Sequence, residues 1–232
     1  MKKLLAVIFA LTLATPGAAQ LSASTPDYVK ARQEAACSTA RRGEVSTRLE
    51  VIRTIDQSSR AHGATMPFTP QSDLENRTEV AMLFAEGCFT SGRDYHNAAL
   101  VYQHGEVPDH YFQTYVWASR AVQLGDMEAQ WLIPRAIDRW AINSGYKQLF
   151  ATNLVTESYF APVTEDSQKT WCVWPNVASI TDRQRTALGV GTLAQQVTRA
   201  KRMNTGLITR QNTGVCTIQV PDPPFGLFPG YW

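Results

Sequence analysis

Three histidines and one aspartate lie near one another in the chain and could bind a metal ion: His96, His104, Asp109 and His110. Metal ligands on a helix usually recur at i, i+3 or i+4, as in the His-Glu-x-x-His zinc motif. His96 and His104 are instead about two helical turns apart, and a turn separates His104 from His110. This spacing favours helix capping or surface placement, so we predict no metal site and no cofactor.

The segment Tyr102–Phe112 places two of these histidines among acidic residues, which also suggests acid–base chemistry. His104 directly precedes Gly105, and glycine is the usual residue at the left-handed position that ends a helix. An imidazole in the last turn can donate to the free carbonyls there and meets the negative end of the helix dipole. We therefore interpret this segment as the corner between two helices.

Asp138 is the acidic residue whose position most strongly indicates burial. It lies in a helical seam that has large apolar members and faces away from the main apolar stripe: Trp131, Arg135, Asp138 and Ile142. A helix that is apolar on two sides is usually covered on both. Because a buried carboxylate needs a partner, we expect Asp138 to pair with Arg135, Arg139 or a backbone amide.

No nucleophile motif stands out, because the chain has no Gly-x-Ser-x-Gly, no Ser-x-x-Lys and no recognisable Cys–His pair. The four cysteines are Cys37, Cys88, Cys172 and Cys216. No Cys-x-x-Cys spacing occurs, so neither a zinc site nor a redox motif is supported. An even count in an exported chain indicates two disulfides, with three connectivities open. We favour Cys37–Cys88 and Cys172–Cys216, one bridge in each half.

The first 19 residues have the three parts of a secretory signal peptide. Lys2 and Lys3 form the basic region, Leu4–Ala14 is apolar, and small residues precede a cleavage site after Ala19. The apolar run is shorter than the roughly 20 residues that cross a bilayer. We predict a periplasmic or secreted protein whose mature chain has no membrane span.

Charge argues against nucleic acid as a partner. The chain has 22 Lys and Arg against 20 Asp and Glu, and loss of Lys2 and Lys3 brings the formal net charge near zero. Nucleic-acid binders usually carry a concentrated basic surface. The densest basic cluster, residues 198–204, is short and is interpreted as a solvated helix face.

Periodicity and turn residues predict a series of helices up to residue 145, over residues 27–42, 44–60, 72–89, 94–105, 108–125 and 126–145. Gly43 is expected to end the first of these helices, and Ser72 or Asp73 to cap the third. Pro134 is expected to kink the last, because it cannot donate to the carbonyl four residues earlier. Beside a buried acid such a kink can form a pocket floor, although a structural ion pair is the commoner outcome.

The last two helices each have an apolar stripe at helical spacing. For residues 108–125 the predicted inward positions are Phe112, Tyr115, Val116, Ser119 and Val122. For residues 126–145 they are Ala129, Leu132, Ile133, Ala136, Ile137 and Trp140. Because short turns join the helices between residues 94 and 145, they must be neighbours in space.

After residue 153 the pattern changes to short strands and helices. Residues 154–163 alternate like a strand, with residues 169–175 as the partner across a turn, and residues 215–220 read as a further strand. One or two helices are expected over residues 181–204, with a break at Gly189 and Gly191. The final segment is rich in proline, glycine and aromatic residues and is expected to wrap over the body or stay loose.

The stretch Val116–Leu132 resembles one unit of the tetratricopeptide-type helical repeats, with a small residue, a helix end, a glycine turn and a Glu-Ala-Gln start. No second copy recurs at a fixed spacing, and arrays of this kind need about three units to bury a core. The resemblance implies a helical hairpin of that style within one domain.

Residues 98–153 resemble an uncharacterised bacterial family of exported helical proteins that carry a Gln-His-Gly turn, an Asp-Arg pair and a Gly-x-x-Gln stretch ending in Gly-Thr-Gln. The matching positions are Gln103, His104, Gly105, Asp138, Arg139, Gly145 and Gln148. The last motif departs from the pattern, since residues 151–153 read Ala-Thr-Asn. The resemblance implies a fold and no reaction.

These patterns predict a mainly α protein with a helical-hairpin, repeat-like core and a small irregular and β C-terminal extension. The expected divisions are a signal peptide (1–19), a helical domain (20–153), an extension with short strands and helix (154–220) and an aromatic tail (221–232).

The predicted function is that of an exported, non-catalytic binding protein with a protein or peptide partner. The candidate binding residues are Gln103, His104, Asp138, Arg139 and Gln148. The alternative is a secreted hydrolase that uses His104 with Asp138 in a cleft of the helical core, or Glu86 and Glu106 as acids. A hydrolase of this kind requires His104 and Asp138 to lie within reach of each other in one pocket.

Overall fold

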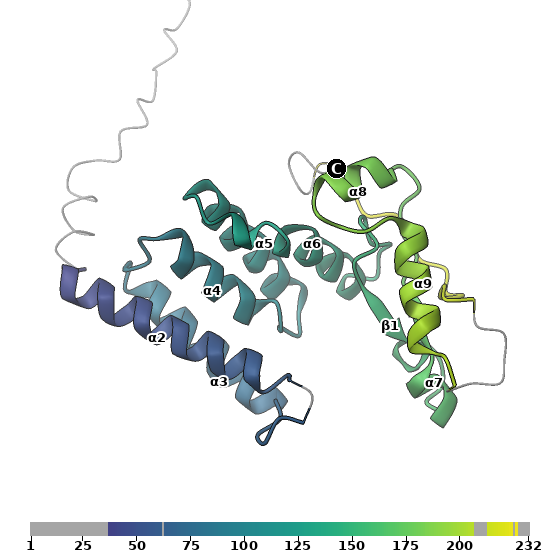
Figure 1. Ribbon diagram of the computed structural model, residues 1–232, viewed down its shortest axis with the longest axis horizontal. Coiled ribbons are helices and arrows are strands. Elements are labelled where there is room, and N and C mark those ends of the chain that lie inside the picture. The colour runs from purple at the N-terminus through teal and green to yellow at the C-terminus, as the bar shows by residue number, and fades with distance from the viewer. Residues whose placement is uncertain (1–36, 62, 207–212, 225, 227–232) are drawn as a thin grey trace, which may run out of the picture.

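The structure, a computed structural model, describes residues 37–61, 63–206, 213–224 and 226. The predicted signal peptide, the first predicted helix up to residue 36 and most of the aromatic tail lie outside these residues. The described chain is mainly helical with a small two-stranded antiparallel sheet, which confirms the predicted fold class. In Figure 1 the N-terminal helices form one side of the molecule and the later elements, in green, form the other.

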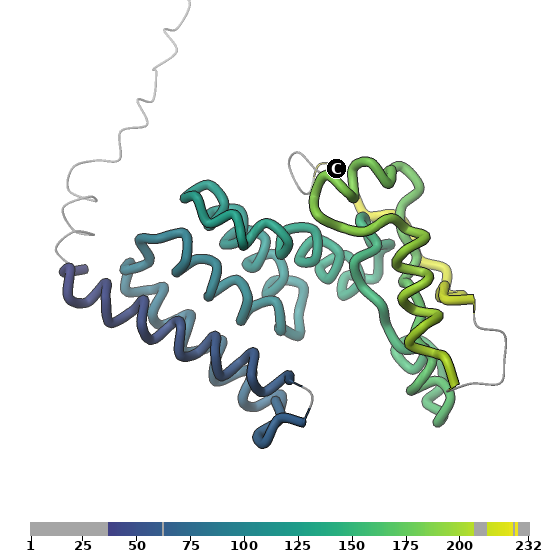
Figure 2. Tube along the Cα trace, in the orientation of Figure 1, coloured from purple at the N-terminus to yellow at the C-terminus, as the bar shows by residue number. Residues whose placement is uncertain are grey.

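The N-terminal part consists of α2 (Thr39–Ser58), α3 (Pro70–Ala85), α4 (Gly92–Tyr102), α5 (Pro108–Gln123), the 3-10 helix η1 (Met127–Ala129) and α6 (Leu132–Asn143). Helix α4 packs along α5, α5 along α6, and α2 along α4. The tube in Figure 2 shows the chain turning back at each short connection. The prediction that the helices between residues 94 and 145 are successive neighbours is therefore confirmed.

Side-chain caps explain where several of these helices begin. The hydroxyl of Thr69 accepts from the N–H of Ser72, whose own hydroxyl accepts from the N–H of Thr69. This capping box, followed by Pro70, starts α3 three residues before the predicted cap, so Ser72 and Asp73 lie inside the helix. Ser91 starts α4 through an equivalent exchange with Asp94.

Gly43 does not end a helix, contrary to the prediction. Helix α2 runs through it from Thr39 to Ser58 and buries the apolar residues Val45, Leu49 and Ile52 on one face. A glycine inside a helix costs about 1 kcal/mol relative to alanine. Burial of three large aliphatic side chains outweighs that cost, at about 1.5–3 kcal/mol for each.

The buried face of α5 differs from the predicted stripe. Phe112 and Val116 are 42% and 40% exposed, while Tyr115 and Val122 pack only at the margin of the core. The positions that are buried are Tyr111, Thr114, Trp117, Ala118 and Ala121. Apolar residues follow helical spacing on two faces of this helix. The small alanine side chains allow close contact with the neighbouring helices, which the stripe of larger residues would not.

Contrary to the prediction, Pro134 does not kink a long helix; it lies in the first turn of α6. The N–H groups of that turn have no partner within the helix, so the missing donor of proline has no consequence there. The predicted single helix is divided into η1 and α6 before this residue. Its predicted apolar stripe is otherwise confirmed, because Ala129, Ile133 and Ile137 are buried.

The C-terminal part contains β1 (Leu154–Thr156), the 3-10 helix η2 (Glu157–Tyr159), α7 (Glu165–Lys169), β2 (Trp171–Val173), α8 (Asp182–Ala187) and α9 (Leu193–Met203). Strands β1 and β2 pair antiparallel, as predicted. The turn expected between them contains α7, which begins with a Thr164–Ser167 capping box. The predicted strand over 215–220 is wrong: Val215 makes one isolated bridge to Val173. Helices α8 and α9 confirm the helical prediction and its glycine break.

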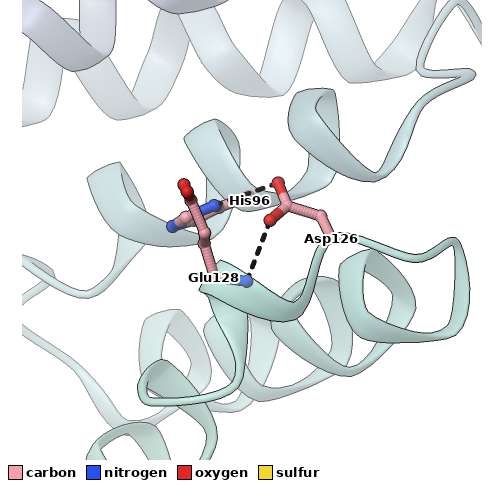
Figure 3. A group of neighbouring side chains, drawn as sticks. All are labelled: His96, Asp126 and Glu128. Atoms are coloured by element: carbon pink, nitrogen blue, oxygen red, sulfur yellow. Dashed lines mark hydrogen bonds and ion pairs between the residues drawn. The ribbon is translucent and has the colours of Figure 1, made fainter.

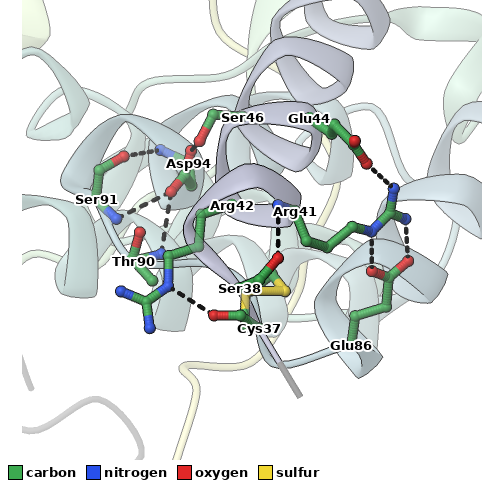
Figure 4. The surroundings of a disulfide bond; sticks show 11 residues. Cys37, Ser38, Arg41, Arg42, Glu44, Ser46, Glu86, Thr90, Ser91 and Asp94 are labelled. Atoms are coloured by element: carbon green, nitrogen blue, oxygen red, sulfur yellow. Dashed lines mark hydrogen bonds and ion pairs between the residues drawn. A yellow bond between two sulfur atoms is a disulfide. The ribbon is translucent and has the colours of Figure 1, made fainter. Parts of the chain in front are cut away.

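Both predicted disulfides are present, Cys37–Cys88 and Cys172–Cys216. The first ties the start of α2 to the residues after α3. Figure 4 shows its surroundings, where Arg41 pairs with Glu86 and Arg42 donates to the carbonyl of Cys37. The second joins β2 to the chain after α9. Within the described residues, no helix is both long and apolar enough to cross a membrane.

Candidate functional site

The end of α4, residues 103–105, is a joint to which three other helices donate. We call these residues the corner. The carbonyl of residue 103 accepts from Arg139 of α6, that of residue 104 accepts from Arg77 of α3 at 3.0 Å, and that of residue 105 accepts from the hydroxyl of Tyr111 of α5. Carbonyls at a helix end need such external donors. These three side chains therefore fill the capping role that the sequence suggested for His104.

The imidazole of His104 instead contacts the end of α2. Its Nδ1 lies 2.9 Å from Oδ2 and 3.2 Å from Oδ1 of Asp56, which is only 1% exposed. Because a carboxylate can only accept, Nδ1 carries the hydrogen and Nε2 is the remaining ring nitrogen. Asp56 also accepts from Gln57 at 2.6 Å and pairs with Arg60 at 3.0 Å. A buried, oriented carboxylate thus holds the ring in place.

Gly105 is required at the corner for space and not for a left-handed backbone, which it does not adopt. A Cβ atom on Gly105 would lie 2.3 Å from the Cβ of His110. The Nδ1 of His110 accepts from the N–H of Glu106 at 3.1 Å, so this ring lies directly over the turn. The prediction of a left-handed glycine is therefore wrong here, although Gly125 and Gly145 do have positive φ.

A cleft of about 450 Å³ opens beside the corner, and we call it the corner cleft. Its lining includes Arg60, Phe68, Asp73, His104, Glu106 and Arg139. Arg60 makes two hydrogen bonds to Asp73, at 2.7 and 2.8 Å, and its guanidinium lies 4.7 Å from the centre of the Phe68 ring. The charge of Arg60 is therefore balanced by Asp56 and Asp73. The volume falls within the range of small-ligand sites.

Arg139 lacks such a balance. Its guanidinium donates to the carbonyl of Gln103 and, at 3.4 Å, to Oδ1 of Asn153, both neutral acceptors. No carboxylate in the part of the chain that the structure describes forms an ion pair with it. Burial lowers the pKa of Arg139; the nearby Tyr111 opposes this, and the charges of Arg60 and Arg135 add to the lowering. A partly buried cation with only neutral partners therefore borders the corner cleft.

Asp138 is fully buried and does not line the corner cleft. One oxygen accepts from the N–H groups of Leu149 and Phe150 at 2.7 and 2.9 Å. The other accepts from the N–H and hydroxyl of Thr152 at 2.8 and 2.7 Å. Burial raises the pKa of Asp138 to about 6, against the opposing effect of these four donors. Of the partners we expected, the backbone amides are the correct ones.

Gln148 has a similar structural role in the same loop. Its side chain donates to the carbonyl of Trp174 at 2.7 Å and accepts from the N–H of Asn153 at 3.0 Å. Asn153 in turn accepts from Arg139. Gln148 therefore connects the loop of residues 148–153 both to the C-terminal part and to the corner.

The five predicted binding residues thus form one connected network with two distinct halves. Gln103, His104 and Arg139 meet at the corner, whereas Asp138 and Gln148 hold the loop. Both polar side-chain atoms of Gln103 are buried without a hydrogen-bond partner among the described residues. The pairing of His104 with Asp138 required for the predicted hydrolase is not formed, since His104 binds Asp56 and four donors occupy Asp138.

Sequence reasoning missed Asp56, Arg60 and Asp73. Asp56 and Arg60 stand four residues apart on a helix, the spacing of an ion pair, which was the available signal. Of the alternative acids, Glu86 pairs with Arg41 on the surface away from the cleft, and that bond lowers the pKa of Glu86. Glu106 lines the cleft and lies 3.6 Å from Arg77.

The four residues considered as a metal set do not converge. His96 contacts Asp126, His104 contacts Asp56, and His110 accepts from the backbone of Glu106. Burial lowers the pKa of His110, which keeps this imidazole neutral as the acceptor role requires. Asp109 is exposed in the first turn of α5.

Comparison with family models, with curated proteins and with solved structures found no match to this chain. The resemblance to a family with a Gln-His-Gly turn and an Asp-Arg pair consequently stays a prediction. What the chain does has to follow from the geometry of its own side chains. The corner cleft brings together Arg139, whose charge is unbalanced, and His104, two of the five predicted residues.

Proposed function

We propose that this chain is an exported, non-catalytic binding protein whose corner cleft holds an anionic group of its ligand. The observation that supports this most is Arg139, a partly buried guanidinium whose two acceptors among the described residues, the Gln103 carbonyl and the Asn153 side chain, are both neutral. Taking a charge out of water without a counter-charge is costly. An anion in the cleft would supply that counter-charge.

The remaining lining indicates the chemical class of the ligand. A guanidinium matches the two oxygens of a carboxylate with parallel hydrogen bonds. Because Asp56 accepts from its Nδ1, His104 offers Nε2 as an acceptor for an N–H group of the ligand. Phe68 adds an apolar wall. The ligand we propose is a carboxylate joined to a small apolar group, as at the end or on an acidic side chain of a peptide.

The two disulfides support the proposed compartment. Disulfides persist in oxidising compartments such as the bacterial periplasm and the extracellular space, and both bridges join cysteines far apart in sequence. Together with the signal-peptide pattern of residues 1–19, they support export to the periplasm or beyond. Expression of the full chain in bacteria, followed by fractionation, should recover a shorter, oxidised form outside the cytoplasm. Recovery only as a reduced, full-length cytoplasmic protein would contradict export.

Calorimetric titration tests the binding proposal. The tag-free protein is titrated with acetate, succinate and the dipeptide Ala-Phe, whose free carboxylate stands beside an aromatic ring. We expect saturable binding of at least one of them, and a loss of about tenfold or more in Arg139→Gln, since a charge-assisted hydrogen bond is worth roughly 1.5–3 kcal/mol.

Two variants make this titration specific. Arg48→Gln removes a surface arginine paired with Glu79 and should bind like the parent. Arg139→Lys keeps the positive charge but loses the planar guanidinium and its pair of parallel hydrogen bonds, so it should bind with intermediate affinity. Thermal melts check that each variant is folded. Absence of binding by all three probes, or equal binding by Arg139→Gln, would refute the proposal.

A second candidate function is acid–base catalysis, and the Asp56–His104 contact favours it. A buried carboxylate on Nδ1 is the arrangement that holds an imidazole ready to accept a proton at Nε2. In that case Asp56, and not Asp138, would orient the base of the predicted hydrolase. Hydrolysis of p-nitrophenyl acetate distinguishes the two functions: turnover that His104→Gln abolishes supports catalysis, whereas equal background rates support binding alone.

A further inference from the structure

A second polar cluster lies on the opposite side of α4 from α2. It joins His96 of α4, Asp126 just before η1, and Glu128 within η1 (Figure 3). The Nδ1 of His96 lies 3.1 Å from Oδ2 of Asp126. Each of the three residues has one atom that could bind a metal ion, and these three atoms lie within 4.8 Å of one another. No other such group occurs among residues 37–61, 63–206, 213–224 and 226.

The backbone around this cluster is closely packed. A Cβ atom on Gly92 would lie 2.8 Å from the Cβ of Asp126 and 2.9 Å from the carbonyl of Ala121, so the start of α4 touches the turn before η1 directly. The N–H of Asp126 donates to that same carbonyl at 3.0 Å. His96 and Asp126 are thereby fixed relative to each other by backbone contacts that do not depend on their own hydrogen bond.

The three side chains differ in solvent exposure, and this difference suits the binding of an ion. Those of His96 and Asp126 are 8% and 13% exposed, whereas that of Glu128 is 77% exposed. The other oxygen of Asp126 accepts from the N–H of Glu128 at 3.1 Å, a second contact that orients this carboxylate. Two ligands are therefore held in place, and the third is an exposed side chain that can close over an ion when it leaves its ion pair with Arg93.

The distances are compatible with a tetrahedral ion. With bonds of about 2.1 Å, neighbouring ligand atoms of a zinc site lie about 3.4 Å apart. The His96–Asp126 contact, at 3.1 Å, is already close to that separation, and a ligand atom of Glu128 lies within 4.8 Å of the other two. Glu128 would leave Arg93, with which it pairs at 2.9 Å, and Arg93 keeps Glu50 as a neighbour at 3.8 Å.

We propose that His96, Asp126 and Glu128 form a zinc site with an open fourth position. An imidazole nitrogen together with two carboxylates favours zinc over calcium or magnesium, which prefer oxygen ligands alone. Two carboxylates also neutralise a divalent ion. The site replaces the expectation that the chain binds no metal, which rested on other partners for His96. It is independent of the corner cleft.

Zinc chloride titrated into the tag-free protein, after dialysis against a chelator, tests the site by calorimetry. We expect one ion per chain, and cobalt should give the visible absorption of a tetrahedral complex. Glu128→Gln should weaken zinc binding by at least about tenfold, and it should fold normally because this side chain is exposed. His96→Gln should abolish binding at one equivalent.

Glu44→Gln is the matched control, since Glu44 is another exposed carboxylate that pairs with an arginine. It should bind zinc as the parent does. Thermal melts show whether His96→Gln is folded, and Glu128→Gln keeps the test decisive if it is not. Absence of binding at one equivalent of zinc would overturn the proposal, and so would binding by Glu128→Gln as tight as that of the parent.

Discussion

The corner at residues 103–105 and the loop at residues 148–153 are both held by polar side chains, but the side chains donate at the corner and accept in the loop. At the corner, donors from three helices bind backbone carbonyls. In the loop, a single carboxylate, that of Asp138, accepts from three backbone N–H groups and a hydroxyl. Asp138 and the loop residues Leu149 and Phe150 are buried, whereas the corner borders a cleft of about 450 Å³.

The difference separates a scaffold from the binding site that we propose. Four donors use both oxygens of Asp138, so nothing there is left for a ligand. At the corner, Arg139 has no counter-charge and the buried amide of Gln103 has no partner among the residues described. We infer that Asp138 supports the fold and that the corner meets the ligand.

The largest effect we expect is on the loop. Asp138→Ala leaves the buried N–H groups of Leu149 and Phe150 and the part-buried one of Thr152 without an acceptor. Each buried group in that state costs roughly 1–3 kcal/mol. The free energy of unfolding in urea should fall by at least about 3 kcal/mol. Asp109→Ala, which removes an exposed acid from the first turn of α5, should cost less than about 1 kcal/mol. A loss of similar size in both variants would remove the distinction between scaffold and surface.

The titration of Asp138 should show the same burial. Its pKa is about 6 in the folded protein and near 3.8 when exposed. A raised folded pKa means that the native state binds this proton more tightly than the unfolded chain does. Its contribution to stability is therefore complete below about pH 4 and is lost as the pH rises through about 6. Carbon NMR of the carboxyl group measures the midpoint directly; a midpoint below 4 would mean that the four donors outweigh burial.

A smaller effect is expected from crowding at the corner. Gly105→Ala places a methyl group 2.3 Å from the Cβ of His110, a backbone-proximal atom that cannot rotate away. Overpacking of this kind costs roughly 1–3 kcal/mol, measured as a loss in the free energy of unfolding. Gly43→Ala, in open space within α2, should instead stabilise the protein by about 1 kcal/mol. Unchanged stability in Gly105→Ala would show that the corner is not tightly built.

The smallest effect concerns Ala151 in the loop, the one described residue other than glycine with positive φ, at 60°. Ala151→Gly relieves about 1 kcal/mol of strain and loses about 0.8 kcal/mol of methyl burial, so the free energy of unfolding should change little. Ala136→Gly, at an equally buried site within α6, loses the methyl group and also helix propensity, about 2 kcal/mol together. Equal losses in the two variants would contradict strain at Ala151.

The family resemblance bears on this same position. The pattern of the resembled family has glycine where this chain has Ala151, and the left-handed backbone there is one that favours glycine. The resemblance, which no comparison tests, is thus compatible with the local geometry of the loop.

Much of the helical part could be predicted from sequence because its signals are local. Gly125 and Gly145 mark helix ends, and the stripe of α6 repeats at helical spacing. The disulfides followed from an even count and a division of the chain into halves. Local pattern failed where two faces of one helix were apolar, as in α5, and where a capping box preceded the expected cap, as in α3.

The site was harder to predict because its partners are distant in sequence. Gln103, His104 and Arg139 were singled out, but Asp56 is 48 positions from the histidine that it holds. The amides that bind Asp138 belong to a loop of irregular structure, whose path no periodicity describes. His96, Asp126 and Glu128 likewise come together only through the close packing of α4 against the turn before η1.

Arginine and histidine side-chain NMR during titration with the dipeptide Ala-Phe is the most direct test of the contrast between corner and loop. We predict that the Nε–Hε signal of Arg139 and the Nε2 signal of His104 shift together and saturate, while the amide signals of Leu149 and Phe150 stay in place. Shifts in the loop amides with an unchanged Arg139 signal, or no saturable shift at either place, would contradict the assignment of the corner as the binding site.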